Sequence, residues 1–181
     1  MQYQPRTIAK DLIARINVAR EKEIFSEQDL TSFEDEAYRL RSADIAEGDM
    51  VLGIIASYRG DARETHKRFK NALAINGETQ AIIHNYGMAL YISGDYSGAI
   101  QILSPVMECD REAAYIVGRA CMLLGLEGRA KSIFDKLEIK DIQEEHKGEA
   151  LTRLAFISSA VGAVKHSFEE DPGIWQSLSK R

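Results

Sequence analysis

The fold is decided by the stretch DMVLGIIASYRGDARETHKRFKNA, residues 49–72. Gly53 and Gly60 lie seven positions apart in it, and Phe69 follows nine positions after Gly60. Apolar residues on either side of Gly60 recur at steps of three and four, which is the spacing of one helix face. Glycine between two such segments is typical of a helix that stops and reverses, because it adopts left-handed backbone at little cost. The stretch therefore predicts two packed helices joined by a turn at Gly60.

The same skeleton returns as IHNYGMALYISGDYSGAIQIL at 83–103 and AYIVGRACMLLGLEGRAKSIFDKL at 114–137. Both glycines recur 34 and then 31 residues later. The first glycine of each unit sits inside a helix, where it costs up to about 1 kcal/mol relative to alanine. That cost is explained if the missing side chain lets the second helix approach closely. On that second helix, a small residue and a large apolar one share a face. The pairs are Thr65 and Phe69, Ala99 and Leu103, and Ala130 and Phe134.

A 34-residue period with these glycines and an A-x-x-x-F pair resembles the tetratricopeptide repeat family. The resemblance covers about residues 44–137 and implies an all-α fold, a right-handed α-α superhelix with capping helices at both ends. The chain departs from the family at its tryptophan-like position, which holds Asp49, Ile83 and Ala114 in the three units. Pro105 falls inside the second helix of the second unit. We expect a kink there, because proline removes a helix hydrogen bond.

Two further helices are expected before the repeats, since the ends of a solenoid need cover. Pro5 opens the first, whose apolar stripe is Ile8, Leu12, Ile16 and Ala19. Ser26 is the expected N-cap of the second, with Asp29 three residues on and a stripe of Leu30, Phe33, Ala37 and Leu40. We expect one compact domain: an N-terminal cap (1–43), three repeats (44–77, 78–109 and 110–137), a C-terminal capping helix (138–166) and a tail (167–181).

Composition excludes several classes of protein. Hydrophobic residues make up 45% and charged residues 28% of the 181, which is ordinary for a soluble domain. A net charge of -5 argues against nucleic-acid binding by a basic surface. The N-terminus has no apolar signal region, and the stretch 154–164 is too short to span a membrane. Cys109 and Cys121 form no framework for disulfides or zinc. We expect a cytoplasmic protein.

Sequence motifs of catalysis are missing. The four histidines form no H-E-x-x-H, and no Walker A, dinucleotide-binding or nucleophile-elbow motif occurs. We therefore expect no enzyme activity, no cofactor and no metal. The basic run at 59–70 carries Arg59, Arg63, His66, Lys67, Arg68 and Lys70. Such a run is usually a solvated helix face, with contact to an acidic partner or RNA as the alternative.

The family resemblance implies a concave groove lined by the first helix of each pair. By position, the groove residues are Met50, Ile54, His84, Met88, Tyr91, Tyr115, Arg119 and Met122. Methionines and aromatics suit an apolar or amphipathic peptide or helix of a partner protein. We expect an adaptor or chaperone-like module. The co-chaperones of this family that bind a C-terminal carboxylate are a poor fit: only Asn85 matches among Met50, Ile54, Asn85, Glu112 and Ile116, and Glu112 would repel the ligand.

Other functions stay open at this point. In length, acidity and layout the chain resembles bacterial class II type III secretion chaperones, which hold an apolar cargo peptide in the groove. A regulator that neutralises a partner enzyme is another alternative. The helix expected at 142–164 is apolar nearly all round in its second half. It either packs as a cap or forms a self-association seam, a possible homodimer, through Phe156, Ala160 and Ala163.

Overall fold

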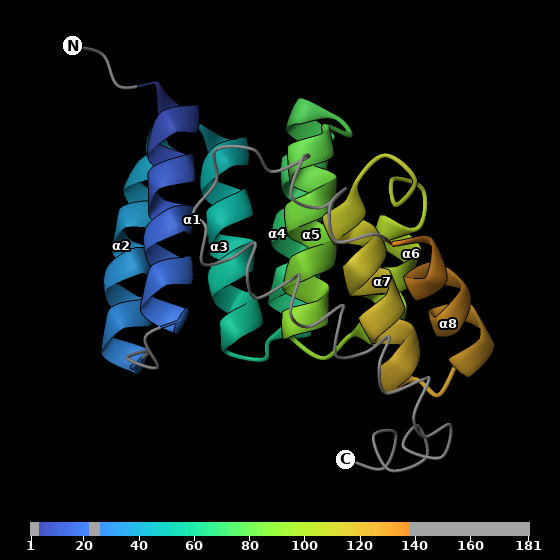
Figure 1. The fold of residues 1–181 in the computed structure, drawn as a ribbon. Helices are drawn as coiled ribbons and strands as arrows, with labels where there is room; N and C mark the ends of the chain where they lie inside the picture. The colour runs from blue at the N-terminus through green and yellow to red at the C-terminus, as the bar shows by residue number, and fades with distance from the viewer. Residues whose placement is uncertain (1–3, 22–25, 138–181) are drawn as a thin grey trace. The chain divides into compact units, whose positions relative to one another are not determined.

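The computed structural model describes residues 4–21 and 26–137, and within them the chain forms eight helices and no strands. The predicted all-α class is therefore confirmed for this part of the chain. The helices are α1 (Pro5–Glu21), α2 (Glu27–Ala43), α3 (Ile45–Tyr58), α4 (Ala62–Asn76), α5 (Gln80–Ile92), α6 (Tyr96–Leu103), α7 (Arg111–Leu123) and α8 (Glu127–Lys136) (Figure 1). No helix in these ranges is long and apolar enough to cross a membrane.

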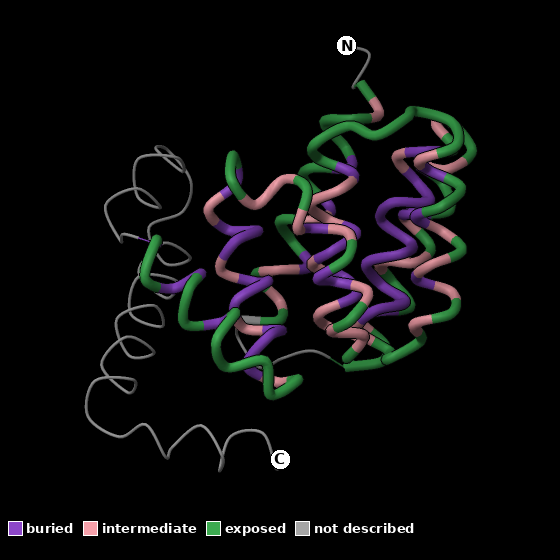
Figure 2. The backbone as a smooth tube through the Cα atoms, turned by 90° about the vertical axis from the view of Figure 1, so that its right-hand side faces the viewer, coloured by how far each residue is buried: buried purple, intermediate pink, exposed green. Residues whose placement is uncertain are grey.

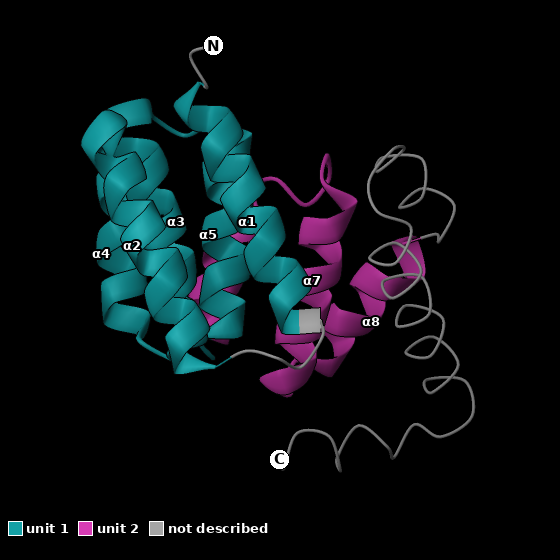
Figure 3. Cartoon of the chain, turned by 90° about the vertical axis from the view of Figure 1, so that its left-hand side faces the viewer, with its two compact units in different colours: residues 1–95 teal, residues 96–181 magenta. Residues whose placement is uncertain are grey.

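The chain divides into two compact units, Met1–Asp95 and Tyr96–Arg181 (Figure 3). The first unit is built around α3, which packs against α1, α2, α4 and α5. Every residue of α3 from Gly48 to Ser57 is buried, whereas α1, α2, α4 and α8 each bury one side and expose the other (Figure 2). In the second unit α7 packs against both α6 and α8. The division falls between the two helices of the second expected repeat.

Side-chain caps start five of the helices. The side chains of Ser26, Asp44, Asp61, Thr79 and Asp110 each accept a hydrogen bond from the backbone N–H three residues on. At Ser26 the contact is reciprocal, because the Asp29 carboxylate accepts from the Ser26 backbone at 2.9 Å. The predicted N-cap and its capping box are therefore confirmed.

The turn after the first helix of each expected repeat has the same geometry three times. Gly60, Gly94 and Gly125 have φ of 73°, 86° and 72°, the left-handed region that favours glycine. Each glycine N–H donates to the carbonyl three residues earlier, at 3.0, 3.2 and 3.0 Å. The next N–H donates to the carbonyl five residues before it, at 3.0, 2.9 and 2.9 Å. These are Schellman motifs, so the predicted helix stops are confirmed.

The mid-helix glycines make the expected close contacts in two of the three expected repeats. A Cβ added at Gly53 would lie 2.7 Å from the ring of Phe69, and one at Gly118 would lie 2.7 Å from the ring of Phe134. Both rings are buried, as are Thr65 and Ala130 one turn before them. Helices α3 and α4, and likewise α7 and α8, therefore approach closely because the first helix carries no side chain at the crossing.

Two local predictions were wrong. Ile8 is exposed, and the buried stripe of α1 is Ala9, Leu12 and Ile16. Pro105 does not kink a continuing helix, because α6 ends at Leu103 and residues 104–109 form turns. The physical reason is that the residue before a proline avoids helical backbone. The predicted C-terminal helix, the tail and the seam at Phe156, Ala160 and Ala163 lie outside the described residues.

Candidate functional site: a partner-binding helix face and its polar supports

The predicted groove residues on α3 belong to the core. Met50 and Ile54 are each 5% exposed. The Asn85 side chain of α5 lies against Met50, with 3.7 Å between its Nδ2 and the Met50 Sδ. At the start of α3, Glu47 is half-buried, and burial followed by the charge of Asp44 raises its pKa. The contact of Met50 and Ile54 with a partner stays a prediction, and in the first unit the Met50 side chain contacts α5.

The groove residues on α5 are more accessible. His84, Met88 and Tyr91 are half-buried and lie on one side of the helix, four and three residues apart. Helix α5 packs against α3 and α4 and begins at the Thr79 cap. We name this set, His84, Met88 and Tyr91, the α5 face. It combines a flexible thioether with two side chains that are apolar in body and polar at one end.

In the second unit, α7 carries the other three predicted groove residues. Tyr115 and Arg119 are half-buried and Met122 is buried. The Tyr115 ring meets Phe134 of α8 edge to face, with 6.1 Å between ring centroids. Glu112, at the position where a carboxylate-binding groove needs a cation or amide, is itself buried. Tyr115, Arg119 and Met122 share a side of α7, four and three residues apart, as the α5 face residues do on α5.

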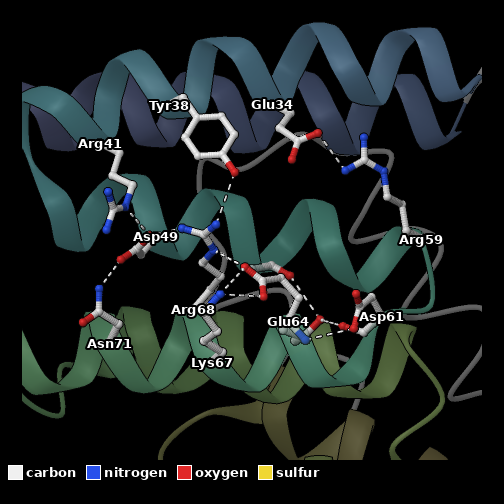
Figure 4. A network of polar contacts seen from close by, with 12 residues as sticks. Glu34, Tyr38, Arg41, Asp49, Arg59, Asp61, Glu64, Lys67, Arg68 and Asn71 are labelled. Carbon is white, nitrogen blue, oxygen red and sulfur yellow. Dashed lines mark hydrogen bonds and ion pairs between the residues drawn. The ribbon is translucent and has the colours of Figure 1, made fainter.

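A buried carboxylate joins three helices of the first unit (Figure 4). Asp49 of α3 is 1% exposed and accepts hydrogen bonds from Arg41 of α2 at 2.6 Å and from Arg68 of α4 at 2.8 Å. The Asn71 amide of α4 also donates to it. Burial raises the pKa of Asp49, but the hydrogen bonds from Arg41, Arg68 and Asn71 outweigh burial and leave this pKa below its ordinary value. Asp49 is therefore a charged, fully paired core residue.

Arg68 extends this network to the surface of α2. Its Nε donates to Glu64 at 2.6 Å, and its Nη2 donates to the Tyr38 hydroxyl at 3.2 Å. Its guanidinium also lies 5.7 Å from the centroid of the Tyr38 ring. Arg59, at the end of α3, donates to Glu27 at 2.8 Å and to Glu34 at 2.7 Å. Charged side chains thus tie α2 to α4 and to the end of α3.

A second polar chain connects α4 to α5. His66 Nδ1 lies 2.5 Å from the Tyr86 hydroxyl, and its Nε2 lies 3.0 Å from the Asp95 carboxylate. A neutral imidazole protonated on Nε2 satisfies both contacts, because Tyr86 then donates to Nδ1. The Tyr86 ring stacks on Phe69 with 4.8 Å between centroids. Burial, followed by the charge of Asp95, raises the Tyr86 pKa.

This tyrosine, histidine and aspartate arrangement acts as a support. Tyr86 is 2% exposed, so the fold covers nearly all of this side chain. The three residues hold α4, α5 and the turn at Gly94 together. No group of three or more potential metal ligands occurs in residues 4–21 and 26–137.

Sequence reasoning missed both polar chains. The basic run at 59–70 was expected to face solvent, yet Arg59, Arg68 and His66 are bound to residues of α2, α3, α5 and the following turn. The signal available was Asp49, a carboxylate next to the apolar run at 50–56, because a charge in such a run requires a buried partner. Comparison of the chain with protein families, curated proteins and solved structures finds no match.

Proposed function

We propose that this chain is a helical-repeat module of the tetratricopeptide type that binds another protein. The observation that carries the proposal is the repetition of one structural unit. Three Schellman turns recur at the expected spacing, and the glycine-to-phenylalanine contact recurs in the first and third repeats. Packing of α1, α3 and α5 in a row supports a solenoid, in which the first helices of successive pairs form one wall. Such scaffolds present surfaces, so function is assigned to a surface and its chemistry.

The partner contact is assigned to the α5 face of the first unit. Tyr115, Arg119 and Met122 of α7 stay a separate prediction for the second unit, where Met122 is buried as Met50 and Ile54 are. Met88 is the proposed apolar anchor, since a half-buried methionine adapts its shape to different side chains. His84 and Tyr91 lie on the same side of α5 as Met88. The partner chemistry that fits is an apolar or amphipathic peptide or helix. Because Met50 and Ile54 are buried, α3 contributes rigidity to this surface.

The test is affinity capture from a lysate of the native cell with M88E as bait. The control bait is V18E, because Val18 is exposed on α1 and receives the same charge. Both variants should keep the wild-type circular dichroism spectrum and thermal midpoint. We expect wild type and V18E to recover a protein that M88E does not. Equal recovery by all three baits would contradict the assignment of the α5 face.

The recovered protein also separates the alternatives. Recovery of a secreted cargo protein would support the hypothesis of a type III secretion chaperone. Recovery of an enzyme whose activity falls when the chain is added would support a regulator that neutralises a partner enzyme. A self-assembling protein predicts a molar mass that grows with concentration in light scattering. A constant monomer mass excludes that alternative.

A further inference from the structure

The exposed charged residues of α4 all have the same sign. The exposed residues of this helix are Arg63, Lys67, Lys70, Asn71, Ala74, Ile75 and Asn76, three cations with no carboxylate. The exposed sides of α2 and α8 mix both signs, with Glu27, Asp35 and Arg39 on α2 and Glu127, Lys131 and Asp135 on α8. The half-buried carboxylate on this helix, Glu64, contacts Lys67 and Arg68. We name Arg63, Lys67 and Lys70 the α4 cation stripe.

Helix geometry places the three cations in line. They are four and three residues apart, which puts their side chains on one side of α4, and Ala74 continues the same line. At about 1.5 Å rise per residue, the stripe is roughly 10 Å long. The opposite side of α4 is occupied, because α3 and α5 pack there. The stripe therefore lies on the outer side of the helix, on a different helix from the α5 face.

Some cations of the basic run at 59–70 are paired with carboxylates of the fold, and those of the α4 cation stripe are paired least. Arg59 and Arg68 are bound to carboxylates of other helices, and Lys67 contacts Glu64 on its own helix at 3.0 Å. Within residues 4–21 and 26–137, the side chains of Arg63 and Lys70 have no ion pair or hydrogen bond. An anionic partner can therefore contact them without breaking a bond that the fold needs.

We propose that the α4 cation stripe binds an acidic helical segment of a partner protein. Carboxylates spaced one turn apart on such a helix match cations spaced one turn apart on α4, and small Ala74 allows close approach at the end of the line. A nucleic acid is the poorer fit, because no exposed aromatic side chain of α4 accompanies the cations and the chain as a whole is acidic. This surface adds to the proposed contact at the α5 face and does not depend on it.

The test measures binding of a defined acidic probe by fluorescence anisotropy at low salt. The probe is a fluorescein-labelled alanine-rich peptide with glutamates one helical turn apart, and its glutamine counterpart is the uncharged control. We expect R63Q/K70Q to weaken binding of the acidic probe about tenfold. K131Q/K136Q removes two exposed charges from α8 and should change the affinity less than about twofold. The charge-preserving swap R63K/K70R should bind like wild type.

Three results would overturn the proposal. The first is the absence of saturable binding of the acidic probe to the wild-type protein. The second is an affinity of R63Q/K70Q equal to that of wild type. The third is tighter binding of a labelled oligouridylate than of the acidic peptide, which would make the stripe a nucleic-acid contact. Because Met88 lies on α5, the variant M88E should bind the probe like wild type. Failure of this test therefore leaves the proposed contact at the α5 face unaffected, and the reverse also holds.

Discussion

Replacing Asp49 by alanine tests the packing of the first unit most sharply. The change removes a carboxylate that is 1% exposed and leaves three donors without their acceptor. The side chain of Arg68 is 15% exposed, so its charge loses a buried partner, and breaking such a pair costs about 3–5 kcal/mol. Glu64 still accepts from Arg68, which places the loss near the lower limit. Arg41 is 38% exposed, so water replaces its lost bond at little cost.

We therefore expect D49A to lower the free energy of unfolding by about 3 kcal/mol and the thermal midpoint by roughly 10 °C. The assay is urea unfolding followed by circular dichroism, with D35A as the control because Asp35 is exposed on α2. D35A should stay within about 0.5 kcal/mol of wild type. A loss below about 1 kcal/mol for D49A would refute the account of Asp49 as a paired core charge.

Three further predictions follow from the same structure. The pKa of Asp49 is lower in the folded than in the unfolded protein, so its stabilising effect is complete above the unfolded pKa of about 4 and is lost as pH falls through the folded pKa. The difference in unfolding free energy between wild type and D49N should therefore shrink in acid. A difference that stays constant with pH would contradict this prediction. In urea unfolding, G53A should lower the free energy of unfolding by about 1 kcal/mol because the new Cβ meets Phe69, whereas G128A, in open space, should raise it by up to about 1 kcal/mol. A change of the same sign in both variants would contradict the close contact at Gly53. S26A should cost about 1 kcal/mol through the lost cap, and a loss no greater than that of exposed S32A would be inconsistent with the capping box.

The turns and caps were predictable because they depend on local chemistry. Gly60, Gly94 and Gly125 are the residues that left-handed backbone requires, and Ser26 with Asp29 forms a capping box within four residues. The crossing at Gly53 was also predictable, because a glycine inside a helix has a cost that close packing explains. These features need no knowledge of distant contacts.

The burial of α3 and the pairing of Asp49 depend on contacts between helices. The prediction that Met50 and Ile54 line a groove assumed a helix that is apolar on one side only. Residues 50–56 are apolar on all sides, which indicates a helix surrounded by others. Arg41 and Arg68 lie 8 and 19 residues from Asp49, and only the packing of α2 and α4 on α3 brings them together. Helical spacing along one segment carries no information about such partners.

The measurement that tests the proposed function most directly is site-specific photo-cross-linking in the native cell. Benzoylphenylalanine is placed at Met88 on the α5 face in one strain and at exposed Val18 on α1 in another. We expect irradiation to join a partner protein to the chain labelled at position 88, with no such product from position 18. Cross-linking of the same protein at both positions, or of none at position 88, would contradict partner binding at the α5 face.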